Sequence, residues 1–234
     1  MKRLAIILAI LVMAVTTVMN LPLSWAGQSF MPNIQNMRPV YSGTLWNGRV
    51  NGLPRIGSME IEISPMKTLL GKSAAQFSVN APALRVNGSA NIKGVINAAL
   101  DGDAFGIADI DPRFAGLQGS YALELKNLHI REKCASGSGT ARTDILQRNA
   151  AFMQWSGPAL SGPITCEDGD IVIALSGGDA QQSVRANIRL DLSGQYRAVI
   201  DLISRDNRAD AVLPLFGFEK TQTGFRLSEA GRWM

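Results

Sequence analysis

The stretch that decides the fold is Val184-Arg-Ala-Asn-Ile-Arg-Leu-Asp-Leu192. Apolar residues occupy every second position from Val184, and polar or charged residues occupy the positions between them. A period of two predicts a β-strand with one buried and one solvated face, as in an antiparallel sheet. Ser193-Gly-Gln195 can then turn the chain into a second alternating run, Tyr196–Ile203, so we expect a β-hairpin here.

Similar short runs recur on both sides of this hairpin. Met59–Ser64 alternates and leads into Pro65, where Ser64 can cap a single helical turn that Gly71 closes. Two glycine-rich stretches, Gly137–Gly139 and Gly177–Gly178, are interpreted as loops. Other expected strands are Gln76–Val79, Ile92–Leu100, Ser120–Ile130, Val212–Leu215 and Phe225–Leu227.

Two features interrupt the simple alternation. In Ser120–Ile130 the apolar phase shifts after Leu125, which predicts a β-bulge near Lys126-Asn127. In Thr143–Gln154 the apolar residues share a helical stripe, so we expect a helix there, capped by Thr143 or Asp144. The expected fold is therefore mainly β: a large curved antiparallel sheet of about ten strands with one short packed helix.

Composition agrees with a globular β-rich chain. The 234 residues include 46% apolar residues, 18% charged residues and 23 glycines. The net charge of +4 becomes nearly balanced once Lys2 and Arg3 are assigned to a membrane flank. Since no basic cluster or basic–aromatic stripe occurs, we expect no nucleic-acid partner.

The N-terminal segment predicts a membrane anchor. Leu4–Trp25 is apolar apart from a few small polar residues and Pro22, and its 22 residues would span roughly 33 Å as a helix. That is enough for a bilayer core of about 30 Å. Lys2 and Arg3 favour a cytoplasmic N-terminus. We therefore expect a single-pass anchor over 1–26, a linker over 27–39 and an exported β-rich domain over 40–234.

Cleavage of the N-terminal segment is the alternative. Ser24-Trp25-Ala26 fits a signal-peptide cleavage site after Ala26. The apolar run is longer than the roughly 7–15 residues of a signal-peptide core, which favours retention. Both interpretations export the domain.

The two cysteines, Cys134 and Cys166, lie in the exported part. Two thiols in an oxidising compartment favour one disulfide. A zinc site would need more ligands than these cysteines and the single histidine, His129, can supply. The sequence therefore predicts a structural disulfide and no metal site.

No catalytic constellation is apparent. His129 would have to be the base of any Ser-His-Asp or Cys-His arrangement, yet it stands in the strand-like context Leu128-His129-Ile130. Asp101, Asp103, Asp109 and Asp111 lack the ligand spacing of a calcium loop. We expect no enzymatic activity and no cofactor.

Several motifs in order resemble one protein family. The most specific is Gly43-Thr-Leu-Trp-Asn-Gly48, about twenty residues after the apolar segment. Together the motifs resemble protein N of type II secretion systems, although the tryptophan often found in the strand before Pro65 is missing. The other motifs are Leu21–Trp25, Ile63–Pro65, Leu69–Gly71, Ser156–Gly162, Cys166–Gly169 and Leu192–Tyr196.

The resemblance implies a bacterial inner-membrane component or accessory of the platform that exports folded proteins, with other platform proteins as partners. It singles out Gly43, Thr44, Trp46 and Gly48 as motif residues, and Trp46 is expected to pack at a strand turn. The alternative is an envelope lipid-binding or lipid-transfer protein, because the apolar face of a curved sheet could form a groove for acyl chains.

Overall fold

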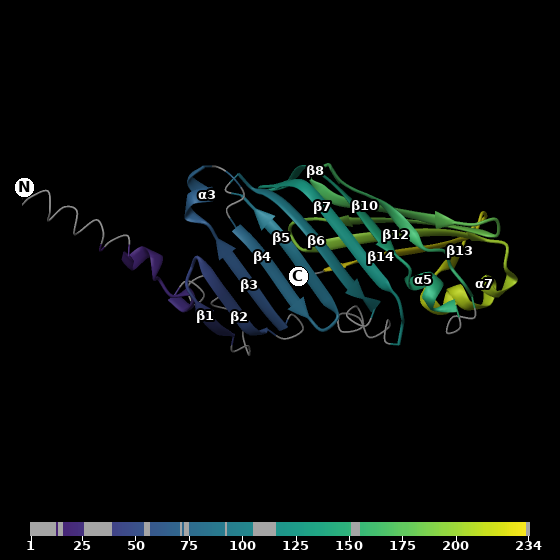
Figure 1. The fold of residues 1–234 in the computed structure, drawn as a ribbon. Coiled ribbons are helices and arrows are strands. Elements are labelled where there is room, and N and C mark those ends of the chain that lie inside the picture. Colours follow the sequence, from purple (N-terminus) through teal and green to yellow (C-terminus); the bar gives the residue numbers. More distant parts are fainter. Residues whose placement is uncertain are drawn as a thin grey trace, which may run out of the picture.

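In the computed structural model, the described part of the chain forms one antiparallel sheet of 14 strands (Figure 1). Each strand up to β12 pairs with its neighbours in sequence, and β14 then lies between β12 and β13. The expected fold class is therefore right for the sheet, but the number of strands exceeds the expected ten. The described residues are 13, 16–25, 39–53, 57–70, 72, 75–91, 93–104, 116–150 and 155–232.

Short hairpin strands make up most of the domain. The first seven are β1 (Val40–Gly43), β2 (Asn47–Leu53), β3 (Gly57–Ile63), β4 (Ala75–Ala81), β5 (Leu84–Ala90), β6 (Val95–Asp103) and β7 (Ser120–Ile130). The other seven are β8 (Cys134–Thr143), β9 (Leu160–Glu167), β10 (Asp170–Gly178), β11 (Gln182–Leu190), β12 (Gln195–Ser204), β13 (Glu219–Lys220) and β14 (Phe225–Arg232). The expected hairpin is β11–β12, in which Val184 lies opposite Leu202.

The strand registers place apolar residues in rows across one face of the sheet. Residues directly opposite each other in antiparallel strands share a face. The apolar face is therefore continuous from β2 to β8. One row consists of Val50, Met59, Val79, Val86, Leu100, Leu123 and Ala141, each opposite the next.

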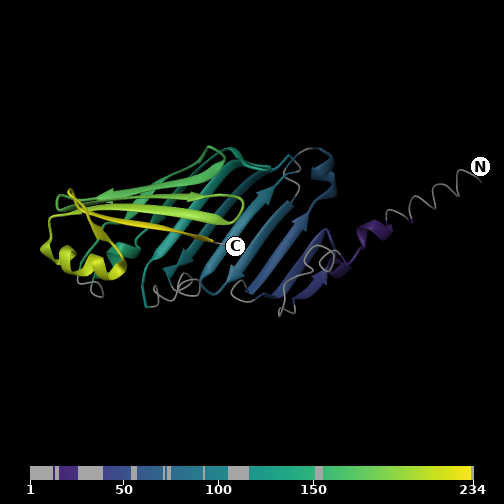
Figure 2. The same cartoon turned by 180° about the vertical axis from the view of Figure 1, so that it is seen from behind.

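The C-terminal half of this face is covered. The sheet curls, and the short helices α5 (Ile145–Arg148) and α7 (Asn207–Val212) lie together at one end of it (Figures 1 and 2). A first core cluster joins the helices to the strands through Trp155, Leu160, Val184, Leu202, Ala209, Leu213 and Phe225. A second core cluster consists of Ala141, Ile164 and Ile173 with half-buried neighbours from β7, β10 and β11.

The same face is only partly buried on β3–β6, although Val50 in β2 is 3% exposed. None of the described inward-facing positions of β3–β6 is fully buried, and none carries a polar side chain. The opposite face carries Glu60, Arg85 and Asp101 in these strands. We call the half-exposed side chains of Met59, Ile61, Phe77, Val79, Val86 and Leu100 the open apolar face.

The predicted irregularities of the strands are confirmed. Between Lys126 and His129 the register of β7 with β8 shifts, and Asn127 has a φ of 50°. This bulge turns Leu128 onto the apolar face, where it is only 3% exposed. Pro65 opens the short helix α3 (Pro65–Leu69), and the Lys67 N–H donates to Ser64 Oγ over 3.4 Å.

Two of our expectations for local structure are wrong. Val212–Leu215 is helical: it joins the end of α7 to the 3₁₀-helix η2 (Leu213–Phe216). The carboxylate of Asp206 caps α7 by accepting from the Arg208 N–H, and an apolar run of this length fits a buried helix as well as a strand.

The glycine-rich stretches form strands as well, because Gly137–Gly139 belongs to β8 and Gly177–Gly178 to β10. A Cβ on Gly139 would lie 2.3 Å from the Glu124 carbonyl oxygen, so this glycine allows β8 to approach β7 closely.

The expected helix over Thr143–Gln154 is present in part. The helix α5 covers Ile145–Arg148 and Ala150 is helical again, while residues 151–154 lie outside the described part. The Asp144 carboxylate accepts from the Ser120 N–H at 2.6 Å instead of capping the helix. That hydrogen bond, with help from Arg148, holds the pKa of Asp144 below its usual value. Asp144 thus fastens α5 to the start of β7.

Cys134 and Cys166 form the predicted disulfide, with their Cα atoms 5.5 Å apart. The bond joins the start of β8 to the end of β9 and encloses α5.

Met13 and residues 16–25 are the described part of the expected anchor over 1–26, and the expected linker lies outside the described residues except at Pro39. Across the described ranges, no helix has both the length and the apolar character to cross a membrane.

Reduction of the disulfide should lower the stability of the full-length protein. A bond between residues 32 positions apart restricts the unfolded chain, and its loss costs roughly 3–4 kcal/mol in the chain-entropy model. Thermal unfolding in detergent should therefore shift to lower temperature in the presence of dithiothreitol. A double Cys134→Ser/Cys166→Ser variant should already unfold at the lower temperature, and dithiothreitol should not change its unfolding temperature. Equal transitions with and without reductant would contradict this prediction.

The two halves of the apolar face should respond differently to truncation. Ile164→Ala, at a side chain only 1% exposed, should cost about 2–5 kcal/mol. Ile61→Ala should cost clearly less, because Ile61 is only half buried. Denaturant unfolding of the full-length variants measures both, with the solvent-facing Glu62→Ala as the control that changes little. Equal losses at positions 61 and 164 would mean that the N-terminal half is packed as tightly as the C-terminal half.

Candidate functional site

The turn between β1 and β2, residues 43–48, contains the four motif residues singled out by the sequence. The Thr44 N–H donates to the Asn47 carbonyl over 2.9 Å. The Thr44 Oγ1 accepts from the N–H groups of Trp46 at 3.3 Å and Asn47 at 3.2 Å. Thr44 therefore closes the turn with both its backbone and its side chain.

Gly43 permits this turn for a conformational reason. Its φ is 83°, in the left-handed region that favours glycine. A Cβ at this position would also lie 2.3 Å from the Asn47 carbonyl oxygen. Any other residue would strain the turn and push β2 away from β1.

The turn binds the end of the N-terminal segment. Residues 16–19 and 23–25 are helical, and the chain between them passes the turn. The Trp46 indole Nε1–H donates to the Val18 carbonyl at 2.9 Å. The Leu45 N–H donates to the Leu21 carbonyl at 3.0 Å, and Pro22 forms a β-bridge with Thr44. These contacts fix the segment to the edge of the sheet.

Gly48 completes the docking site. A Cβ on Gly48 would lie 2.5 Å from Leu23 Cδ2 and 2.8 Å from the Thr44 carbonyl oxygen. The absence of a side chain therefore provides the space that Leu23 occupies. Gly48 itself is buried beneath it.

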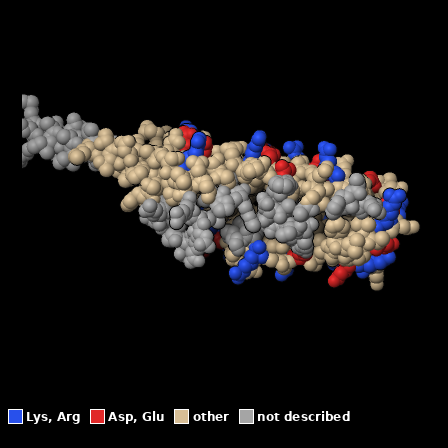
Figure 3. All heavy atoms as spheres, turned by 90° about the horizontal axis from the view of Figure 1, so that it is seen from below, with Lys and Arg blue, Asp and Glu red and all other residues tan. Residues whose placement is uncertain are grey.

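The surroundings of this docking site are uncharged. Residues 16–25 and 40–48 include no Lys, Arg, Asp or Glu. In Figure 3 the described surface next to the N-terminal end is free of charged side chains, which gather farther along the molecule. Arg49 and Glu60 form an ion pair on the opposite face of β2 and β3. The docking therefore depends on hydrogen bonds to the backbone carbonyls of Val18 and Leu21 and on apolar packing.

Each motif residue has a structural task in this geometry. Sequence reasoning gave Trp46 a packing role at a strand turn, and the structure adds a hydrogen bond to a backbone carbonyl 28 positions earlier. Val18, Leu21 and Leu23 were not predicted as part of the site. The motif Leu21–Trp25 had marked two of them as part of a family-like stretch, but their contacts with the turn are tertiary and no local pattern reveals them.

One family model matches most of the chain. It describes protein N of the type II secretion system (T2SS) and matches residues 40–228. The chain belongs to this family. The match includes the whole turn at 43–48, but starts after the segment that docks on it. No curated protein and no solved structure matches the chain significantly.

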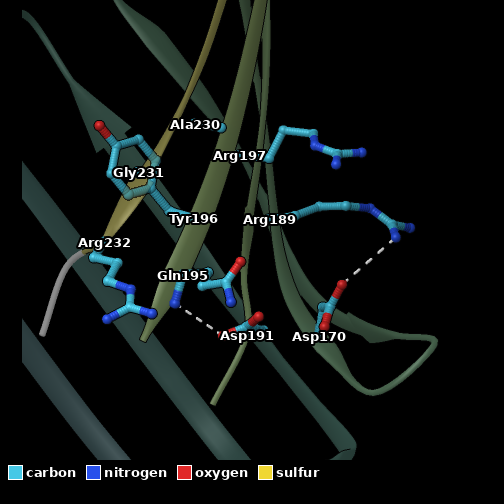
Figure 4. A pocket seen from close by; sticks show the side chains of 9 residues that line it. All are labelled: Asp170, Arg189, Asp191, Gln195, Tyr196, Arg197, Ala230, Gly231 and Arg232. Atoms are coloured by element: carbon cyan, nitrogen blue, oxygen red, sulfur yellow. Dashed lines mark hydrogen bonds and ion pairs between the residues drawn. The ribbon is translucent and has the colours of Figure 1, made fainter. Parts of the chain in front are cut away.

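A charged pocket is lined by the C-terminal strands of this T2SS protein N chain. It has a volume of about 490 Å³ and is lined from β10, β11, β12 and β14 (Figure 4). Arg189 lies within 4 Å of Glu167, Asp168 and Asp170, so its charge is balanced locally. Arg197 stands directly opposite Arg189. The pocket therefore mixes both signs of charge in an exposed setting, where ion pairs contribute little.

The remaining candidates for chemistry are dispersed. His129 lies in β7 opposite Val95 and Ser136. Asp101 and Asp103 lie in β6, whereas Asp109 and Asp111 fall outside the described residues. Within the described ranges, no group of three or more His, Cys, Asp or Glu side chains is arranged to hold a metal ion.

Trp46→Phe should loosen the docked segment. The change removes the indole N–H that donates to Val18, and one such hydrogen bond contributes about 0.5–1.5 kcal/mol. The Leu45 amide, which donates to Leu21, should then exchange with deuterium roughly two- to tenfold faster.

The matched control is Trp155→Phe. Trp155 lies in the first core cluster, and its indole N–H is buried without a hydrogen-bond partner. Its replacement should leave exchange at Leu45 unchanged. An unchanged rate in the Trp46 variant as well would show that the indole does not hold the segment.

Proposed function

We propose that the chain is a non-enzymatic inner-membrane component or accessory of the type II secretion system. It acts by protein–protein interaction in the periplasm and supports the export of folded proteins. The observation that carries this proposal is the family match over residues 40–228, which includes the turn that docks the N-terminal segment. The motif residues Gly43, Thr44, Trp46 and Gly48 have structural tasks, which favours an architectural role.

The same turn supports retention of the N-terminal segment over residues 1–26, which we propose to be the membrane anchor. Cleavage after Ala26 would remove Val18, Leu21 and Leu23, which are bound at the turn. The N–H groups of Leu45 and the Trp46 indole would lose the carbonyls that accept from them. Lys2 and Arg3 favour a cytoplasmic N-terminus, so the sheet would lie in the periplasm, close to the inner membrane.

Docking of the anchor would fix the sheet relative to the membrane. A flexible linker alone would let the domain sample many orientations. The contacts at 43–48 instead join the first strands directly to the end of the anchor. The polar face of the sheet, with Glu60, Arg85 and Asp101, would then face other platform proteins in a restricted orientation.

Removal of the protein from its host should impair type II secretion. Cells that lack it should retain folded cargo in the periplasm, and the full-length gene should restore release into the medium. A double variant, Trp46→Ala/Gly48→Val, should restore release only in part, because both changes disturb the docking of the segment. Cargo in the periplasmic and medium fractions is measured by immunoblot.

Two controls make the outcome interpretable. The double variant must accumulate in the inner-membrane fraction with Cys134 and Cys166 oxidised, which shows that the domain has folded. The Trp155→Phe variant should restore release fully. Normal cargo release without the protein would contradict the proposed function.

A further inference from the structure

The proposed function leaves the open apolar face unexplained. Its rows are aliphatic or aromatic, and they are partly exposed from Met59 in β3 to Leu100 in β6. Water contact with a contiguous apolar surface is costly, about 25 cal/mol per Å². Soluble monomers rarely leave such a patch larger than a few hundred Å² without a partner. An occupant is therefore expected.

The mode of pairing limits what this occupant can be. Each of β3, β4, β5 and β6 is hydrogen-bonded to a strand on both sides. A peptide strand therefore finds no free edge there and cannot bind by strand addition. The described inward-facing positions of β3–β6 also offer no polar side chain to a peptide backbone laid across them. The face suits a ligand that has no polar groups along its length.

The position of the face points to the source of that ligand. The docked segment contacts β2 through Leu23 and Gly48, and the open apolar face begins at the next strand. If the segment is the membrane anchor that we propose above, the face starts at the membrane surface and leads away from it. An acyl chain could then pass from the bilayer onto the sheet without crossing water.

The dimensions agree with one acyl chain. The four strands β3–β6 cover about 14–15 Å across the sheet at the usual strand spacing. One leaflet of a bilayer core is about 15 Å thick, half of the full core. The far end of the face is closed, because Ala141 in β8 and Ile164 in β9 are fully buried in the second core cluster. Toward the anchor, Val50 in β2 is only 3% exposed and Gly48 lies beneath Leu23, so the partly exposed stretch is limited to β3–β6.

From these observations we propose that the open apolar face binds the acyl chains of a membrane phospholipid, whose headgroup stays at the rim near the anchor. This inference rests on the membrane attachment in the proposed function, but not on its link with secretion. Residues of β3–β6 that face inward line the site, and the charged residues of the opposite face take no part.

Photo-crosslinking in living cells tests the proposal with the full-length protein. Benzoylphenylalanine replaces either Val86 on the open apolar face or its neighbour Asn87 on the opposite face. After irradiation and purification, intact-mass analysis should show a phospholipid adduct from position 86 and none from position 87. A protein adduct from position 86, whether a second copy or a platform subunit, would overturn the proposal. So would a folded, oxidised chain without an adduct.

A second measurement avoids the bulky probe. Phospholipid that remains with the purified protein after detergent washing should be near one molecule per chain. Leu100→Asp should reduce it at least tenfold, because a carboxylate would stand in the apolar row. Ala99→Asp, one residue away on the exposed opposite face, should leave it unchanged. Equal lipid content in both variants would overturn the site assignment.

The same variants separate this inference from the proposed function. Normal cargo release together with no lipid adduct from the probe at position 86 would refute the lipid site and leave the secretion role intact. A retained adduct in a protein whose removal does not affect secretion would do the reverse.

Discussion

Pairing of each strand with its neighbour in sequence is the constraint on which the rest of the structure depends. Because opposite residues share a face, a single register carries the apolar row from Val50 through Met59 to Ala141. A slip of one residue would turn every later side chain to the other face. The bulge at Asn127 corrects the phase of β7 and keeps Leu128 inside. The apolar side chains of successive strands therefore stay on the same face of the sheet.

Much of this sheet could be predicted because its signals are local. The β11–β12 hairpin, the bulge near Asn127 and the cap at Ser64 each depend on a few consecutive residues. Val212–Leu215 could not be assigned in this way, since four apolar residues fit a strand or a buried helix, and packing in the first core cluster decides. Gly139 lies in a strand that approaches the Glu124 backbone closely, and no local sequence pattern reveals this tertiary contact.

Only part of the candidate site could be predicted from the sequence, because its other contacts are tertiary and leave no local signal. The motif Gly43-Thr-Leu-Trp-Asn-Gly48 predicts a turn, and the T2SS protein N family match includes it. That Trp46 reaches back to Val18 is a tertiary contact. The difference between the open and the covered half of the apolar face likewise depends on where the helices and the curl of the sheet lie (Figure 2).

Sequential pairing also shapes how such a chain reaches its native state. When a polypeptide emerges N-terminus first, whether from a ribosome or from a pore, each strand meets its partner as soon as the next short segment appears. Each new strand can therefore pair with the strand before it while the rest of the chain is still emerging. β14 interrupts this order, because it joins β12 only after the helical segment and β13 have passed. The first core cluster includes Phe225 of β14, so it can be complete only after this last strand has joined the sheet.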